Sequence, residues 1–388
     1  MEQLRAWWWH RQGLDGSLAG LAPAEVLART GWARSVGGAN PYLTLFARAG
    51  LSRVDIDNAV AALDIYELPS ARGCTYVVPA ADFGLALQVG RGAPEGEVAT
   101  VAKLGVPRAE LDTLCAAVLD AVARGPLDPA ELKAVLGDRV RNLGEAGKKK
   151  GVTTTLPVAL GLLQASGELR RVPVDGRLDQ QRYAYVRWDA PDSGLPDDEA
   201  RVELVRRHLG WTGGASVAHL RWFTGFPARD VKSALAALEP VEIAEGILAL
   251  PGDAKSYADH QAPDLPQYAL LAGIDALILL RRDVPSLLAP EDLDRPVPGS
   301  DRVLGKHTDL PDHAIFDRGR LVGLWQFEVD GQRIAWWTFE SVDERALLSE
   351  VERTEAFIRE ELGDARSFSL DSPKSRAPRV AALDAARS

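Results

Sequence analysis

Residues Gly147 to Arg187 read GKKKGVTTTLPVALGLLQASGELRRVPVDGRLDQQRYAYVR, and this stretch decides the fold. Its apolar residues between Leu156 and Leu163 recur with the spacing of a helix that is buried along a broad face. Pro157 fits only the first turn of such a helix, where its missing N–H has no intrahelical partner. We therefore expect the helix to begin near Thr154 or Thr155, with a threonine as its cap.

Gly167 ends this helix, and two short apolar runs on either side of Asp175-Gly176 predict a β-hairpin directly after it. Upstream, residues 108–124 are strongly periodic, and Asp128-Pro129 is a typical start for a further helix. Three helices followed by a hairpin are typical of a winged helix, in which the last helix enters a major groove.

Cationic and hydroxyl side chains surround this predicted helix and its wing. Such side chains would meet the phosphates of DNA if the unit binds a duplex. The candidate DNA-binding residues are Lys148, Lys149, Lys150, Thr153, Thr154, Arg170, Arg171, Arg177 and Arg182, together with Arg72 in an earlier hairpin. The alternative is that the lysine run is simply a solvated loop, and the run alone does not decide between them.

The same order of predicted elements occurs twice more. Residues 22–62 carry three helical segments, followed by a hairpin that bends at Ser70–Gly73. Residues 197–239 carry three more, followed by a hairpin around Glu245-Gly246. Three such units in tandem predict winged helices that pack on one another.

The pattern changes in the last third of the chain. Residues 268–283 are apolar enough to be a buried strand or helix, and residues 313–341 alternate around two turns, which predicts a three-stranded meander. A final amphipathic helix follows, to about Leu362. The expected fold class is α+β, mainly α. The expected domains are residues 1–95 (an N-terminal helix and the first winged helix), 96–190 (the second), 191–262 (the third), 263–365 (the β-meander with its helix) and 366–388 (a flexible tail).

The composition of the chain limits which functions are compatible with it. The chain has 388 residues and a net charge of −10, which opposes binding to a polyanion unless the charge is unevenly distributed. It is uneven, because residues 191–203 are acidic whereas residues 139–187 are basic. Neither a membrane span nor a signal peptide is visible, so we expect a cytoplasmic protein that is nucleoid-associated when bound to DNA, with no membrane partner. Cysteines and histidines lack metal-ligand spacing, so no metal and no organic cofactor are expected.

Three consecutive tryptophans, Trp7, Trp8 and Trp9, cannot all face one side of a helix. They could offer a stacking platform for a nucleobase. Packing of the N-terminal helix against the body is the stronger interpretation.

Three segments now support a family resemblance: GWARSVGGANPYLTLFAR (31–48), ELPSARGCTYVVPAADF (67–83) and GRLVGLWQFE (319–328). With the tandem order of elements, from about Leu18 to Glu361, the chain resembles the AlkZ/YcaQ family of bacterial DNA glycosylases. The resemblance implies binding of double-stranded DNA, excision of N7-alkylated purines and unhooking of interstrand crosslinks, without a metal or organic cofactor.

The chain departs from this family at the residues nearest the chemistry. The family's Gln-x-Gln or Gln-x-Asp motif follows Gly-Leu, and Gly31-Trp32 stands at that place, so the two motif positions fall on Ala33 and Ser35. The family's Arg-Gly-Thr-x-His segment becomes Arg72-Gly73-Cys74-Thr75-Tyr76, in which tyrosine replaces histidine.

Ser35 and Asn40 are the nearest polar side chains and thus the candidate catalytic residues, which would orient a water molecule. Asp55 and Asp57 are possible carboxylates. The competing interpretation makes Asn40 a helix cap and Asp55 part of a capping box.

Three functions remain open from the sequence: a monofunctional DNA glycosylase, a non-catalytic regulatory or lesion-binding DNA protein on the same scaffold, and a protein-interaction module. Salt-sensitive binding separates the third from the others, and release of free base separates the first two. The sequence leaves the oligomeric state open.

Overall fold

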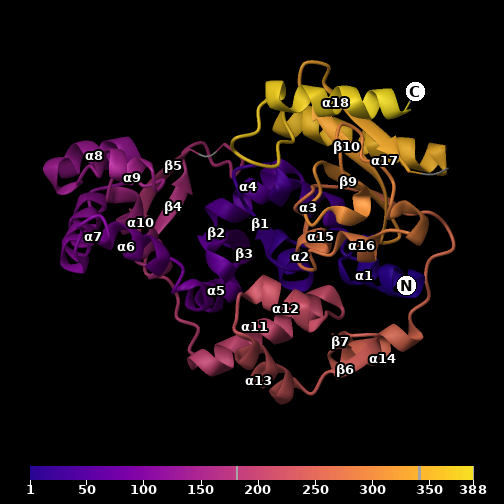
Figure 1. The fold of residues 1–388 in the computed structure, drawn as a ribbon, viewed down its shortest axis with the longest axis horizontal. Helices are drawn as coiled ribbons and strands as arrows, with labels where there is room; N and C mark the ends of the chain where they lie inside the picture. Colours follow the sequence, from indigo (N-terminus) through magenta and orange to yellow (C-terminus); the bar gives the residue numbers. More distant parts are fainter. Residues whose placement is uncertain (181, 340–341, 388) are drawn as a thin grey trace. The chain divides into compact units, whose positions relative to one another are not determined.

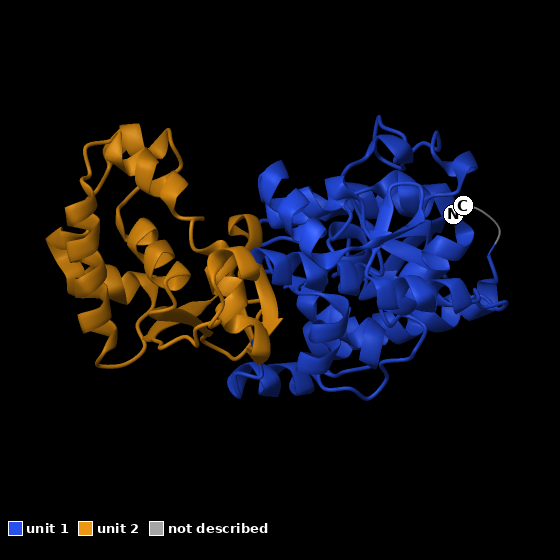
Figure 2. Ribbon diagram, turned by 90° about the horizontal axis from the view of Figure 1, so that it is seen from below, with its two compact units in different colours: residues 1–65, 201–388 blue, residues 66–200 orange. Residues whose placement is uncertain are grey.

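The computed structural model describes residues 1–180, 182–339 and 342–387. The chain forms two compact units, coloured separately in Figure 2: unit 1, residues 1–65 and 201–388, and unit 2, residues 66–200. Unit 1 is thus built from both ends of the chain, and unit 2 is inserted between them. Across the described residues, no helix has both the length and the apolar character needed to span a membrane.

Unit 2 holds the stretch that the sequence analysis started from (Figure 1). Its elements, the first of which begins at the boundary, are β2 (Ile65–Pro69), β3 (Thr75–Pro79), α5 (Phe83–Gly90), α6 (Glu95–Ala102), α7 (Arg108–Val122), α8 (Pro129–Leu136), α9 (Gly144–Lys148), α10 (Leu156–Ala165), β4 (Leu169–Pro173) and β5 (Tyr183–Arg187). As predicted, α10 begins directly after Thr155, with Pro157 in its first turn. Asp128 caps α8 as predicted, because its carboxylate accepts from the N–H groups of Ala130 and Glu131.

The core of unit 2 explains why α10 is apolar almost all round. Leu156, Leu160 and Leu163 pack with the inner faces of α7 and α8 and with the β4–β5 hairpin. Val158, on another side of the helix, packs in a second cluster with Val101 and Leu111. Because α10 is buried on both sides, it forms the centre of unit 2.

Unit 1 begins with α1 (Glu2–Arg11), α2 (Pro23–Thr30), β1 (Ala33–Arg34), α3 (Asn40–Ala49) and α4 (Arg53–Ala61). After unit 2 the chain continues through α11 (Asp197–Thr212), α12 (Val217–Thr224), α13 (Ala228–Leu238), β6 (Val241–Ala244), β7 (Ile247–Ala249) and α14 (Pro251–Asp259). It ends with β8 (Tyr268–Leu271), α15 (Ala276–Leu279), α16 (Val284–Leu287), β9 (His313–Asp317), β10 (Arg320–Glu328), β11 (Arg333–Thr338), α17 (Glu344–Phe357), a π-helical turn (Ile358–Leu362) and α18 (Pro373–Arg387).

The predicted meander is confirmed and gains a strand. β9, β10 and β11 pair in antiparallel register, with Trp325 opposite Trp336, and β8 adds to the outer side of β9. The sheet order is therefore β11-β10-β9-β8. The apolar stretch that could have been strand or helix is both, because β8 leads into α15. Arg318 and Gly319 form the β9–β10 turn with φ of 46° and 83°, the left-handed geometry that two-residue hairpin turns favour.

The tryptophan run of α1 is part of the core of unit 1. Trp7, Trp8 and Trp9 are 2%, 1% and 0% exposed, in one cluster with the inner faces of the sheet. The indole N–H of Trp7 donates to the carbonyl of Gly213 at 2.6 Å. Packing is therefore confirmed as the role of these rings, and a stacking platform is excluded because no face is open to a base.

Other predictions need correction. The tail expected to be flexible forms α18, which packs on β10 and β11 and buries Arg376, Val380 and Leu383. The hairpin predicted to turn tightly at Asp175-Gly176 has a longer connection, because β4 ends at Pro173 and β5 begins at Tyr183. The lysine run, for which a solvated loop was the alternative interpretation, begins in the short helix α9.

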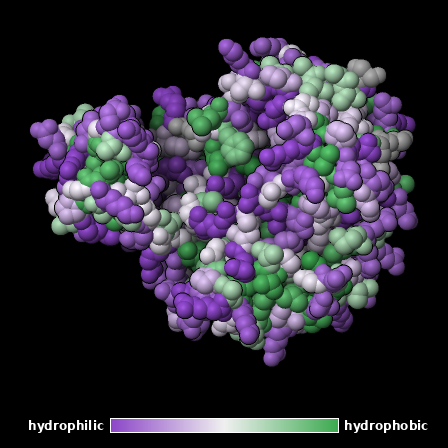
Figure 3. Space-filling view, viewed as in Figure 1, coloured by the Kyte–Doolittle hydropathy of each residue, from purple (hydrophilic) through white to green (hydrophobic). Residues whose placement is uncertain are grey.

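The helix-helix-helix-hairpin order is observed for α7, α8, α10, β4 and β5, and again for α11, α12, α13, β6 and β7. That these sets are winged helices, with the domain boundaries given above, stays a prediction. On the face drawn in Figure 3, hydrophilic side chains predominate and hydrophobic ones form separate small groups.

Candidate functional site: the motif segment and a basic surface

The segment that carries the motif positions, residues 33–40, lies inside unit 1, and we call it the motif segment. Ala33 is in β1, Ser35 follows it, and Asn40 is the first residue of α3. Their exposed fractions are 0%, 2% and 1%. The two candidate catalytic residues are thus close in the chain and buried.

Asn40 belongs to a buried polar network. Its side-chain N–H donates to the carbonyl of Arg34 at 2.7 Å, and its Oδ1 accepts weakly from the hydroxyl of Thr44 at 3.4 Å. Thr44 also donates to Asp275 at 3.0 Å. Asn40 is therefore not a helix cap, since Ala39 holds that position; its amide links β1 to α3.

Asp275 and Arg48 form the centre of the network. Both side chains are almost fully buried, and the two guanidinium nitrogens donate to the two carboxylate oxygens at 2.8 Å each. Gln12 accepts from Arg48 at 2.7 Å. The two charges of this bidentate pair neutralise each other within the protein, although the Nε of Arg48 has no hydrogen-bond partner among the described residues.

A backbone segment of the last third covers the motif segment. The N–H of Ala39 donates to the carbonyl of Arg366 at 2.9 Å, and the N–H of Ser369 donates to the carbonyl of Val36 at 3.1 Å. A Cβ atom on Gly38 would lie 2.3 Å from the carbonyl oxygen of Arg366. Glycine is therefore required at this close approach, and the main chain of residues 366–369 packs against residues 36–39, directly after the motif positions.

His313 fixes the start of this covering segment. Its Nε2–H donates to the carbonyl of Ala365 at 2.6 Å, while its Nδ1 accepts from the N–H of Gly273 at 3.2 Å. Both bonds need the neutral ring, and burial lowers the pKa of His313 to about 3.

The two alternative carboxylates are also engaged. Asp55 accepts from the backbone N–H and the hydroxyl of Ser52, which holds the pKa of Asp55 below its usual value and confirms the predicted capping box. Asp57 accepts from the hydroxyl of Tyr42 at 2.6 Å and from Arg53 at 2.5 Å. Both carboxylates serve the local structure of α3 and α4.

The lysine segment of unit 2 has the opposite character. Lys148, at the end of α9, pairs with Glu145 at 2.7 Å, but both side chains are more than 60% exposed. Lys149 and Lys150 are exposed, and within the described residues neither has an ion-pair partner. Thr153 is exposed and Thr154 half-buried, on the way into α10. These five candidates lie together on one solvated surface, which we call the lysine segment, residues 148–154.

The arginines predicted to line the wing are mostly paired. Arg171 contacts the buried carboxylate of Glu67 at 2.9 Å and lies over the ring of Tyr183. Arg177 forms a two-pronged pair with Asp179 at 2.9 and 2.6 Å. Carboxylates of unit 2 therefore already neutralise these two arginines, and their role as DNA contacts stays a prediction.

The remaining three arginines are less constrained. Arg182 is exposed and lies 3.9 Å from Asp175, too far for a strong pair. Arg170 is half-buried over the ring of Tyr66. Arg72 is exposed in the turn between β2 and β3, with a left-handed φ of 60°. All ten DNA-binding candidates lie in unit 2, whereas both catalytic candidates lie in unit 1.

Helix α10 offers little for reading base edges. Its polar side chain is Gln164, and that amide donates to the carbonyl of Leu160 within the same helix. A major-groove reader needs several donors or acceptors on its exposed face. The lysine segment can therefore contact phosphates, which carry no sequence information.

No group of three or more His, Cys, Asp or Glu side chains suited to a metal ion occurs among the residues that the structure describes. The sequence analysis did miss one basic group, the arginines Arg11, Arg29, Arg206 and Arg207, which line a pocket of unit 1. They are far apart in the chain, so no motif or spacing could have indicated them.

Comparison with known proteins now places this architecture. The family of AlkZ-like DNA glycosylases matches residues 30–366, and the chain belongs to this family. Membership implies DNA as the partner and a relation to DNA repair. Among solved structures, the chain is similar to the Streptomyces sahachiroi DNA glycosylase AlkZ, with a TM-score of 0.69 and 20% sequence identity over 94% of this chain and 97% of that one. At this identity the likeness shows the fold. The search of curated proteins gave no match.

Proposed function

We propose that the chain binds double-stranded DNA in a largely sequence-independent way and does not excise bases through the family's motif. DNA as partner follows from family membership. The single observation that carries the loss of excision is the state of the motif segment. Ala33 and Ser35 replace the amide and carboxylate side chains, and main-chain atoms of residues 366–369 cover the segment.

The lysine segment is the proposed phosphate-binding surface. Lys149 and Lys150 are exposed and have no carboxylate partner among the described residues, so they would release counterions when they bind a duplex. The lack of base-reading groups on α10 supports binding to shape or damage over binding to a sequence. A role in lesion recognition, in the cytoplasm and on the nucleoid, belongs to the same proposal.

A second candidate is a glycosylase that excises N7-alkylated purines and unhooks interstrand crosslinks. It is favoured by the position of the motif segment inside the matched residues 30–366. An N7-alkylated purine is cationic and leaves readily, so a modest catalyst such as Ser35 would suffice if the covering segment moved aside.

One experiment separates these functions. A duplex carrying N7-methylguanine is incubated with the full chain, free base is quantified, and binding is measured at 50 and 200 mM salt, with an active glycosylase as positive control. We expect salt-sensitive binding and no base release above the protein-free background. Release that disappears in Ser35→Ala would establish the second candidate. Absence of binding at both salt concentrations would contradict both DNA-binding candidates and favour a protein-interaction module.

A further inference from the structure

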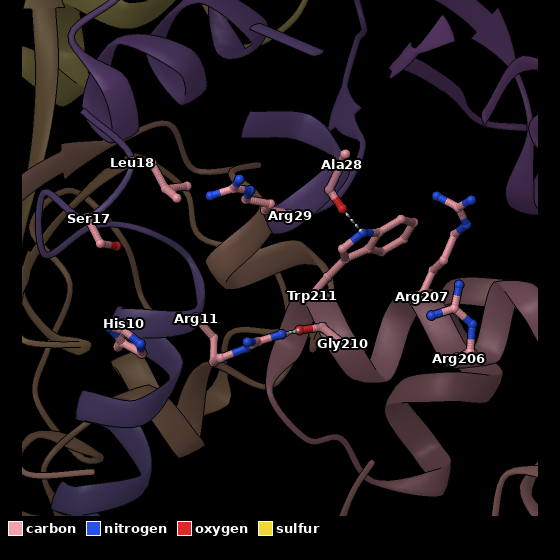
Figure 4. A pocket seen from close by; sticks show the side chains of 10 residues that line it. All are labelled: His10, Arg11, Ser17, Leu18, Ala28, Arg29, Arg206, Arg207, Gly210 and Trp211. Atoms are coloured by element: carbon pink, nitrogen blue, oxygen red, sulfur yellow. Dashed lines mark hydrogen bonds between the residues drawn. The ribbon is translucent and has the colours of Figure 1, made fainter. Parts of the chain in front are cut away.

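A pocket of about 460 Å³ opens in unit 1, and two of its lining residues, Ala28 and Arg29, belong to α2, which ends just before the motif segment (Figure 4). It lies between α1, the segment that follows α1, α2 and α11. Its lining residues are His10, Arg11, Ser17, Leu18, Ala28, Arg29, Arg206, Arg207, Gly210 and Trp211. Its size is that of a small-molecule site.

Positively charged side chains predominate in the lining of this pocket. Four arginines from three helices line it, and no carboxylate is among the lining residues. Glu203 pairs with both Arg206 and Arg207, at 2.5 to 2.9 Å, and Asp253 lies 3.4 Å from Arg11. Asp15, which bonds to His10 and accepts from the hydroxyl of Ser17, is a third carboxylate beside the lining. Arg29 is the lining arginine for which the described residues supply no carboxylate partner.

Arg29 therefore carries the positive charge that no carboxylate of the described residues compensates. Its side chain is exposed, and no described residue forms a hydrogen bond or an ion pair with it. Figure 4 shows it projecting from α2 into the space between the α1–α2 segment and Trp211. An arginine without a carboxylate partner, at the centre of a basic pocket, favours an anion as the missing partner.

The walls of the pocket are fixed. The indole N–H of Trp211 donates to the carbonyl of Ala28 at 3.0 Å, which ties α11 to α2. Arg11 donates to the carbonyl of Gly210 at 2.5 and 3.2 Å, which ties α1 to α11. Trp211 is only 2% exposed, so its ring supports the pocket and offers no face to a base. The pocket is therefore formed before any ligand arrives.

We propose that this pocket binds a phosphate group, with Arg29 as its principal ligand and Arg206 and Arg207 as further cations. A guanidinium fork matches the oxygens of a phosphate in two-pronged geometry, and the uncompensated charge of Arg29 favours an anion of this kind. Two sources carry this chemistry: a soluble nucleotide and the backbone of DNA. The proposal does not rest on the function proposed above, because a soluble phosphate would fill the pocket even if the chain did not bind DNA.

The test uses the full chain with two probes, 5′-deoxyguanosine monophosphate and an undamaged 20-base-pair duplex. Binding is measured by calorimetry for wild type, Arg29→Ala and the matched control Arg229→Ala, which removes an equally charged, 86% exposed side chain on α13. Both arginines are exposed, so we expect both variants to keep the melting temperature of the wild type.

Each outcome decides a part of the proposal. Mononucleotide binding that weakens about tenfold in Arg29→Ala and is unchanged in Arg229→Ala assigns a soluble ligand. Duplex binding that weakens in Arg29→Ala alone, with a salt slope smaller by about one and no mononucleotide binding, assigns the DNA backbone. The proposal is overturned if neither probe binds, or if both variants change binding equally. Mononucleotide binding without duplex binding would refute DNA binding and leave this pocket standing.

Discussion

The motif segment and the lysine segment are both short stretches just before a helix that begins with a proline in its first turn, yet they differ in every physical respect. Residues 33–40 lead into α3, are mostly buried, and are held by hydrogen bonds within unit 1. Residues 148–154 precede α10 and are largely exposed, and Lys149 and Lys150 have no ion-pair partner among the described residues. The first segment therefore acts through shape and stability, and the second acts through charge.

This difference sets expectations for substitutions in the two places. Changes at the motif segment should alter the free energy of unfolding more than any binding constant. Changes at the lysine segment should alter affinity for polyanions and its dependence on salt, with little effect on stability.

The largest contrast should come from the two ion pairs. Asp275→Ala leaves the guanidinium of Arg48 buried without its carboxylate and should lower the free energy of unfolding by about 3 to 5 kcal/mol. Glu145→Ala removes the exposed partner of Lys148 and should cost less than about 1 kcal/mol. Urea denaturation of both variants measures the two losses in free energy of unfolding. Equal losses would contradict the expected difference between the buried and the exposed ion pair.

The glycine under the covering segment gives the next largest effect. Gly38→Ala would place a methyl group against the carbonyl oxygens of Arg366 and Ser367, so we expect a loss of about 3 kcal/mol. Gly252→Ala is the control, because nothing lies within 4 Å of the added methyl group. If Gly38→Ala is as stable as the control, residues 366–369 do not press on the motif segment.

The next expected effect concerns pH: acid should lower the free energy of unfolding of unit 1. Burial lowers the pKa of His313 and of His208 to about 3, so both rings stay neutral in the folded protein while the unfolded chain takes up protons below about pH 6.5. The stability that these neutral rings hold is present above pH 6.5 and is lost as pH falls toward 3. The loss is roughly 1.4 kcal/mol per pH unit for each histidine.

Denaturation midpoints at pH 7.5 and 5.0 measure this dependence. His313→Gln should flatten it, although the variant is less stable at both pH values because the bond to Ala365 changes. An unchanged dependence in this variant would show that His313 is protonated in the folded state.

The smallest effect in free energy should come from the lysine segment. The double variant Lys149→Ala/Lys150→Ala should reduce the slope of log affinity against log salt for duplex DNA by about two and weaken binding about tenfold near physiological salt. Lys103→Ala/Lys133→Ala removes two other exposed lysines of unit 2 and serves as the control. Equal changes in both double variants would show that net charge, and not this surface, drives binding.

Much of the fold could be predicted because its signals are local. Capping residues such as Asp128 and Ser216 mark helix starts through bonds to N–H groups two or three residues away. The Glu245-Gly246 turn and the two turns of the meander are likewise signalled by residues that lie within four positions of one another. Helix α18 was missed, because its Pro378 and its many polar residues favour a flexible tail, and only the sheet beneath it supplies a place for Val380 and Leu383.

The site could be predicted less well because its decisive contacts are long-range. Nothing in the sequence after Ser35 indicates that residues 366–369 would pack against residues 36–39, and nothing around Arg171 indicates that Glu67 would neutralise it. The replacement of the motif glutamines is visible in the sequence. Its physical counterpart, a segment closed by main chain, is visible only in three dimensions.

The division of unit 1 between the two ends of the chain has a consequence for its synthesis. Trp7, Trp8 and Trp9 leave the ribosome well before the strands that bury them, which belong to residues 268–338. At about 5 to 20 residues per second, those strands follow roughly 15 to 60 s later. Unit 2 can fold on the ribosome in that interval, while the three indole rings remain exposed to solvent. The nascent chain is therefore most prone to aggregation, and most accessible to chaperones, before residue 338 has been synthesised.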